Sequence, residues 1–168
     1  MIVLEKQLSR VYEEIDMVTT PTGKPVAMVH CNNCCTDLDY WVKLFIEFSS
    51  LSGNNLTKGE IYDLLYNEAL KGDSDCGKIV SINYFSGEPV TGFLQGRPML
   101  LRSENSNFNL ANFMRTHIYS AIATLKIGME ILEEENVNID KLMGHGGLFK
   151  TKSVSYTHLR AHETVLDL

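Results

Sequence analysis

Three stretches of the chain carry apolar residues at the three- and four-residue spacing of a helix: 38–48, 61–70 and 110–132. Thr36 or Asp37 can cap the first stretch. Before the second, Thr57 and Glu60 stand three residues apart, the capping-box spacing in which two side chains satisfy two free backbone amides. The third holds its period for about six turns. The pattern therefore predicts three helices, the last of them the longest.

Strands are predicted before, between and after these helices. The first segment, 3–15, alternates apolar and polar residues, and the Pro- and Gly-rich run 20–25 separates it from the short apolar run 26–29. Residues 79–85 are rich in β-forming side chains, and 139–143 is a further short apolar run. The stretch 86–107, with three Gly and two Pro, is predicted to be mostly loop. Helices and strands thus mix along the chain, which favours an α/β or α+β class.

Composition excludes several classes of protein. The 168 residues carry 15 Lys and Arg against 21 Asp and Glu, a net charge of −6, and 44% of them are hydrophobic. This is one ordinary domain's worth of chain, with enough apolar residues for a core. The acidic balance and the lack of a basic block argue against nucleic acid or an anionic membrane as partner. No apolar run is long enough to span a bilayer, and no basic-then-apolar leader is present, so a cytoplasmic protein is expected.

The C-terminal tail is interpreted as foreign to the protein. From Val154 onward it resembles one translated frame of a transposase-end sequencing adapter. The alternative is a short amphipathic helix in which Leu159, Val165 and Leu166 form the apolar side. We therefore expect a native region, 1–152, and a non-native tail, 153–168.

Cysteines cluster at one point of the chain, where Cys31, Cys34 and Cys35 follow His30. A zinc site needs about four ligands, usually from two separated pairs, and no second pair exists. A redox role for Cys31-x-x-Cys34 would favour a helix start with the first Cys exposed. The cluster is therefore interpreted mainly as small side chains in a tight turn, with metal and redox roles as the alternatives. No metal site is predicted.

Three further segments could carry chemistry. The turn that holds Asn33 joins a strand to a helix start, where free backbone amides attract anions, although every such turn shares this geometry. The Gly-rich run 144–147 fits either a close approach of backbone to a nucleotide or a plain tight turn. Ser86, Gly87 and Glu88 follow a strand end, where a carboxylate could orient a metal ion or a ribose hydroxyl, or could lie in solvent. His117 falls on the apolar side of the longest helix and is interpreted as a core histidine.

Taken in order, these segments resemble the C-terminal, actin-like domain of the FGGY family of carbohydrate kinases, in a xylulokinase-like form. Four segments carry the resemblance: Asp39-Tyr40-Trp41-Val42, Asn83-Tyr84-Phe85-Ser86-Gly87-Glu88-Pro89, the long helix 110–132, and the Gly-Gly loop 143–151. Two departures from the family pattern indicate a divergent subgroup. Thr116-His117 replaces a usual Glu-Gly, and Leu148 replaces an Ala.

The resemblance implies a partial actin-like ATPase domain, with a mixed sheet and flanking helices, and an activity that transfers phosphate from ATP to a sugar hydroxyl. It implies ATP and Mg²⁺ as cofactors, the sugar as a small-molecule partner, and a homodimer of the full-length parent as one arrangement. It places Thr36 and Tyr40 beside the nucleotide, Gly146 and Gly147 against the ribose and α-phosphate, and Thr151 near the adenine. Our own reading of the turn adds Asn33 to these nucleotide-binding residues, and the cleft candidates are the three residues 86–88.

The family's catalytic Asp and first phosphate loop have no counterpart in the chain, so no catalytic residue is assigned. The chain is expected to be an internal piece of a longer kinase and inactive by itself. Which sugar is used stays open, with a xylulose-like ketopentose suggested by the Ser86-Gly87-Glu88 match. The alternative function is a non-catalytic actin-like module, or a module that binds metal or thiols through its Cys cluster.

Overall fold

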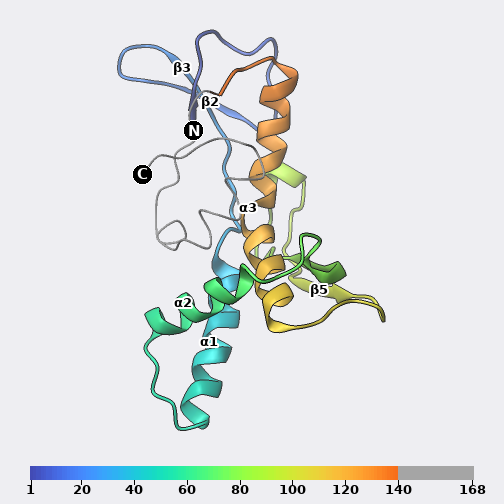
Figure 1. Ribbon diagram of the computed structural model, residues 1–168. Coiled ribbons are helices and arrows are strands. Elements are labelled where there is room, and N and C mark those ends of the chain that lie inside the picture. Colours follow the sequence, from blue (N-terminus) through green and yellow to red (C-terminus); the bar gives the residue numbers. More distant parts are fainter. Residues whose placement is uncertain (140–168) are drawn as a thin grey trace.

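The computed structural model describes residues 1–139 (Figure 1). Its elements in chain order are β1 (Ile2–Val3), β2 (Asp16–Thr19), β3 (Pro25–Met28), α1 (Thr36–Leu51), α2 (Lys58–Ala69), the 3₁₀ turn η1 (Cys76–Lys78), β4 (Ile79–Ile82), the 3₁₀ turn η2 (Pro89–Thr91), β5 (Met99–Arg102) and α3 (Leu110–Glu134). The strand predicted at 139–143, apart from Ile139, and the tail 153–168 lie outside the described residues.

The strands form two small sheets. β3 lies between β1 and β2, and β4 pairs with β5. All of these pairs are antiparallel. The prediction of a long strand over 3–15 is wrong, because β1 ends at Val3 and β2 begins only at Asp16. The loop predicted for 86–107 contains β5, whose three consecutive apolar residues form too short a run to show the alternation of a half-buried strand.

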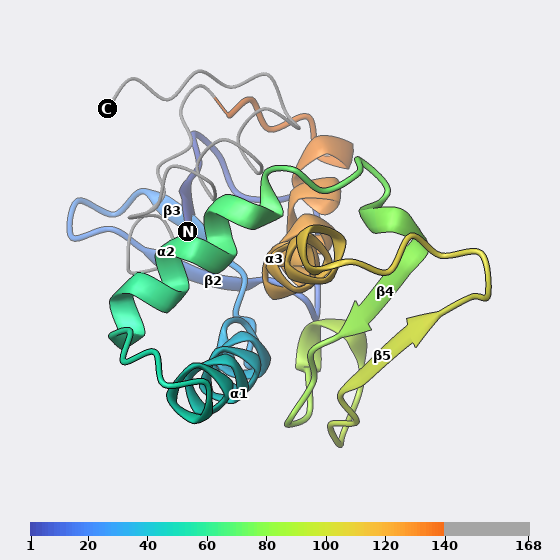
Figure 2. The same cartoon turned by 60° about the horizontal axis from the view of Figure 1, so that its bottom comes forward.

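The long helix α3 runs through the molecule (Figures 1 and 2). It is shared by two apolar cores. Near its start, Phe113, Met114 and Ile118 pack against buried residues of α1 and α2. Near its end, Leu132 packs against residues of the N-terminal segment and β3. A helix with apolar residues along most of its length can serve two cores in this way. Its position fixes α1 and both sheets relative to one another.

The start of α2 follows the sequence closely, whereas that of α1 does not. The predicted capping box is confirmed, since Thr57 accepts a hydrogen bond from the Glu60 amide at 3.3 Å and Glu60 accepts one from the Thr57 amide at 2.8 Å. At α1, by contrast, the predicted caps Thr36 and Asp37 are already helical. The capping position is Cys35, which makes no capping bond through its side chain. The first turn of α1 therefore begins without the side-chain acceptor that α2 has.

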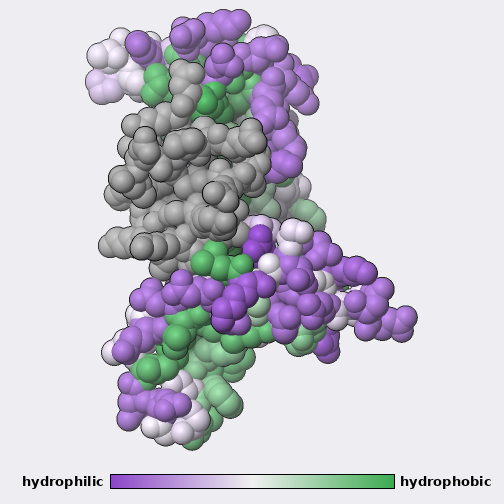
Figure 3. Space-filling view, in the orientation of Figure 1, coloured by the Kyte–Doolittle hydropathy of each residue, from purple (hydrophilic) through white to green (hydrophobic). Residues whose placement is uncertain are grey.

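One side of α1 packs on the core, while Leu44, Phe48 and Leu51 on its other side are exposed. Apolar surface accordingly gathers at the end of the molecule where α1 lies (Figure 3). Among residues 1–139, no helix is long and apolar enough to cross a membrane.

Close packing of α3 on the end of β3 can be tested at Gly128. A Cβ built there would overlap a methyl group of Val29 and would lie 3.2 Å from the Val29 Cβ. Gly128→Ala should therefore lower the free energy of unfolding by about 1–3 kcal/mol, as overpacking does. Gly59, on α2, has no atom within 4 Å of such a Cβ. Gly59→Ala is the matched control, which should be neutral or stabilising by up to about 1 kcal/mol. Urea unfolding followed by circular dichroism measures both, and equal effects would contradict the packing.

Candidate functional site

The turn between β3 and α1 is held against the loop that follows β4 by the side chain of Asn33. Its Oδ1 accepts hydrogen bonds from the amides of Phe85 at 2.8 Å and Ser86 at 2.9 Å. Its Nδ2 donates to the Ser86 carbonyl at 3.1 Å and to a Glu88 carboxylate oxygen at 3.2 Å. Asn33 is only 2% exposed. One buried amide thus joins two segments that lie more than fifty residues apart in the sequence.

Glu88 completes this junction from the other side. Its Oε1 accepts a hydrogen bond from the amide of Asn32 at 3.2 Å, and its Oε2 accepts one from the amide of Asn33 at 3.1 Å. The residue has no exposed surface. Asn83 adds a third side chain, whose Nδ2 donates to the carbonyls of Asn33 and Cys34, each at 3.0 Å. We call Asn33, Asn83 and Glu88, with the backbone they bind, the turn clamp.

Two residues that the sequence singles out belong to the turn clamp. Both polar atoms of the Asn33 side chain are bound to residues 85–88, so Asn33 positions the turn. Glu88 does not lie in solvent, which was one of its two alternatives, because its carboxylate is buried against two backbone amides. Buried polar groups need hydrogen-bond partners, and here the carboxylate of Glu88 and the two backbone amides satisfy each other. Ser86 and Gly87 of the same loop keep exposed surface.

Thr36 and Tyr40, also expected at the nucleotide, lie on an accessible side of α1. They stand four residues apart, so they share one side of the first helical turn. Thr36 is exposed and Tyr40 is 53% exposed. The ring of Tyr40 stacks on that of Phe85, with centroids 4.8 Å apart and planes 14° apart. This contact brings Tyr40 to the loop that carries Ser86. Gly146, Gly147 and Thr151 lie outside the described residues.

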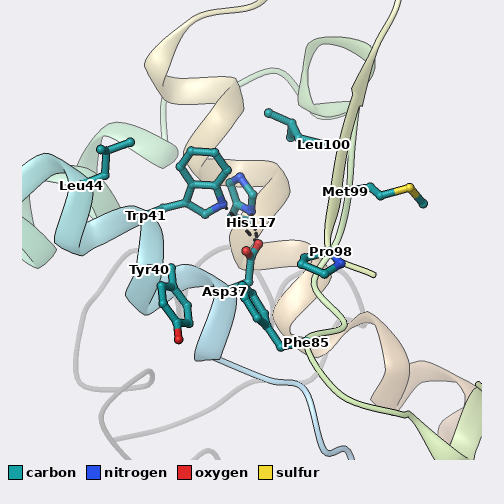
Figure 4. Close-up of a pocket in the computed structure, with 9 residues that line it drawn as sticks. All are labelled: Asp37, Tyr40, Trp41, Leu44, Phe85, Pro98, Met99, Leu100 and His117. Carbon is teal, nitrogen blue, oxygen red and sulfur yellow. Dashed lines mark hydrogen bonds and ion pairs between the residues drawn. The ribbon is translucent and has the colours of Figure 1, made fainter. Parts of the chain in front are cut away.

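A cavity of about 370 Å³ opens between α1, β5 and α3 (Figure 4). Its lining is mostly apolar and consists of Asp37, Tyr40, Trp41, Leu44, Phe85, Pro98, Met99, Leu100 and His117. The carboxylate of Asp37 accepts a hydrogen bond from Trp41 Nε1 at 3.3 Å and lies 3.0 Å from His117 Nδ1. His117 Nδ1 is also 3.0 Å from the hydroxyl of Ser81.

His117 is thus buried, as predicted for a core histidine. Its Nε2 is buried and has no hydrogen-bond partner among the described residues. The rings of Phe113 and Trp41 pack on the imidazole, with centroids 4.5 Å and 5.2 Å away. The pairing of His117 with Asp37 was not predicted, because the two residues lie 80 positions apart and leave no local pattern in the sequence.

The cysteine cluster does not form a metal centre within the described residues. Cys31, Cys34 and Cys35 are partly exposed and Cys76 is buried in another part of the molecule. Residues 1–139 contain no group of three or more His, Cys, Asp or Glu side chains that could hold a metal ion. Any ion bound through the described cluster would therefore have fewer than three ligands from this part of the chain.

Comparison with known proteins gives two matches. The model of the C-terminal domain of the FGGY family of carbohydrate kinases matches residues 1–158. The crystal structure of xylulose kinase from Bifidobacterium adolescentis is similar, with a TM-score of 0.67 over 90% of this chain at 16% sequence identity. The chain covers 28% of that kinase chain. No curated protein matches the sequence. The structural similarity confirms the predicted actin-like ATPase fold, of which this chain forms a part.

The contribution of the turn clamp can be measured at Glu88. Glu88→Gln keeps the size of the side chain but replaces one carboxylate oxygen with an NH₂ group. That group cannot accept the hydrogen bond from the backbone amide that faced the oxygen. The substitution should therefore lower the free energy of unfolding by about 2 kcal/mol or more. Hydrogen exchange at the amides of Asn32 and Asn33 should also become faster. Ser86→Ala is the control, because it removes only a hydroxyl at the edge of the clamp, with a 3.3 Å bond to Asn33. Unchanged stability and unchanged exchange in Glu88→Gln would contradict the role of the carboxylate.

Proposed function

Because the chain belongs to the FGGY family of carbohydrate kinases, we propose that it works as part of an enzyme that transfers the γ-phosphoryl group of ATP to a sugar hydroxyl. The family match over residues 1–158 carries this proposal. A xylulose-like ketopentose is our proposed substrate, from the Ser86-Gly87-Glu88 motif. The proposed contribution of this chain is one wall of the nucleotide cleft.

The proposed nucleotide contacts are Thr36 and Tyr40, with Gly146, Gly147 and Thr151 from the segment outside the described residues. Thr36 opens α1, whose free amides and positive dipole end favour a phosphate group. The two acidic residues of that first turn are engaged elsewhere. Asp37 is buried against His117, and Asp39 accepts a hydrogen bond from Tyr62. The start of α1 therefore suits an anion in spite of its two carboxylates.

In this proposal Mg²⁺ arrives bound to the phosphates of ATP. Magnesium ions are commonly held by one or two carboxylates together with substrate phosphates. Within residues 1–139 no cluster of three ligating side chains exists, and both oxygens of Glu88 are occupied by backbone amides. We therefore assign no Mg²⁺ ligand to the described residues.

The chemistry that follows from this proposal is mainly positioning. Phosphoryl transfer needs the attacking and leaving oxygens in line and the phosphate charge neutralised, while a carboxylate takes the proton of the attacking hydroxyl. The turn clamp supplies the positioning, since it fixes the residues that lead into Thr36. Closure of a second domain over the sugar would exclude water, so that ATP is not simply hydrolysed.

Measurements of nucleotide binding test the proposal that this chain forms one wall of the nucleotide cleft. Tyr40→Ala should weaken binding of ADP by about tenfold, the equivalent of roughly 1.4 kcal/mol. Isothermal titration calorimetry on the purified chain would measure this. Leu44→Ala is the control, because Leu44 is similarly exposed on the same helix, one turn further on. Equal ADP affinity of Tyr40→Ala and the unchanged chain would contradict the assignment of Tyr40.

Catalysis by the 168-residue chain alone is not expected. The family match is to the C-terminal domain. The resemblance to the family gives this chain no counterpart of the catalytic Asp or of the first phosphate loop. A coupled assay for ADP with a panel of ketopentoses should therefore show no sugar-dependent release. Measurable sugar-dependent ADP formation by the purified chain would contradict this expectation.

A further inference from the structure

Two adjacent thiols meet just before α1. The sulfur atoms of Cys34 and Cys35 lie 3.6 Å apart, and both residues are partly exposed. Neither sulfur has another hydrogen-bond partner within residues 1–139. The backbone that carries them is fixed, because the Cys34 carbonyl accepts a hydrogen bond from Asn83 at 3.0 Å. The turn clamp therefore holds this pair in place.

The two thiols differ in their readiness to ionise. The hydrogen bond from Cys35 lowers the pKa of Cys34 from 9.0 to about 7, against the opposing effect of burial. The same interaction raises the pKa of Cys35. Burial raises the pKa of Cys31 and of Cys76 to about 11. The pair thus offers one thiolate and one thiol near neutral pH, whereas the other two cysteines stay protonated.

A disulfide between Cys34 and Cys35 would be strained. Disulfides usually join Cα atoms about 4.4–6.8 Å apart, with an S–S bond near 2.05 Å. Neighbouring Cα atoms across a trans peptide are only about 3.8 Å apart. The structure contains no cis peptide bond within the described residues. The present S–S contact would also have to shorten by more than an ångström.

The same spacing suits an atom that bridges the two sulfurs. Two thiolates on one tetrahedral zinc ion, with Zn–S bonds of about 2.3 Å, would lie about 3.8 Å apart. A pyramidal arsenic(III) centre has smaller bond angles and draws its sulfur ligands slightly closer. Zinc would still lack half of its usual four ligands, because the described residues offer no third metal-ligating side chain at this place. An arsenic(III) centre that carries one organic group is complete with two sulfurs.

We propose that Cys34 and Cys35 form a preorganised dithiol site for a trivalent arsenical that carries one organic group. With phenylarsonous acid, two As–O bonds break and two As–S bonds form. The two hydroxyl groups leave with the two thiol protons as two molecules of water. Arsenic stays trivalent and both sulfurs keep their oxidation state, so the step needs no oxidant. This proposal does not rest on the proposed kinase function.

Intact-mass spectrometry of the reduced full chain tests the site, with phenylarsonous acid as the probe and dimercaptopropanol as a competing dithiol. We expect one C₆H₅As adduct per chain. Cys34→Ser and Cys35→Ser should each lose the adduct at a dimercaptopropanol concentration at least a hundredfold lower than the unchanged chain does. Cys31→Ser and Cys76→Ser are the matched controls and should retain the adduct as the unchanged chain does. Circular dichroism checks that each variant is folded.

Three results would overturn the proposal. The first is retention of the adduct in Cys34→Ser or Cys35→Ser at the same competitor concentration. The second is its loss in Cys31→Ser, which would assign the arsenical to the Cys31–Cys34 pair. The third is that the same dimercaptopropanol concentration removes the adduct from the chain unfolded in urea and from the folded chain. In that case adjacency in sequence alone would account for binding, because the preorganised pair should resist at least tenfold more competitor than the unfolded one.

Discussion

The buried carboxylate of Glu88 is the interaction on which the start of α1 depends. Burying a charge costs several kcal/mol unless hydrogen bonds replace the lost water. Here the amides of Asn32 and Asn33 and the Asn33 side chain provide three donors. The same bonds satisfy amides that would otherwise be buried without partners. The Glu88 carboxylate and the turn are thus stable only together. The hydrogen bonds between them determine where α1 begins.

A second polar junction ties α1 to α3 and β4. His117 meets Asp37 of α1 and Ser81 of β4 through one ring nitrogen. The neighbouring Thr116 donates a hydrogen bond to the Ile79 carbonyl at 3.1 Å. Thr116 and His117 both make contacts between elements, so these two neighbouring polar residues of α3 belong to the packing of this chain.

How much could be predicted from the sequence depended on the range of the interactions involved. The helices and the capping box of Thr57 and Glu60 were predictable, because their signals lie within a few residues of each other. β5 was not, since its three apolar residues show no alternation and the strand forms by pairing with the distant β4. The roles of Asn33 and Glu88 were equally hidden. Each residue suited a ligand when considered alone, and only the fold brings them together across fifty-five positions.

In our proposals the end of the turn carries two negatively charged groups close together. A helix N-terminus stabilises negative charge only within its first turn. The free amides of α1 would favour a phosphate beside Thr36, whereas the thiolate of Cys34, two residues earlier, is favoured by the hydrogen bond from Cys35. A phosphate there disfavours the thiolate by like-charge repulsion, and a neutral arsenic–sulfur adduct removes that repulsion while it adds bulk at the turn. Because the pKa of Cys34 is about 7, the balance between the two charges changes across the neutral pH range. The turn clamp binds the Cys34 carbonyl, so the backbone that carries this thiol cannot shift to relieve the repulsion.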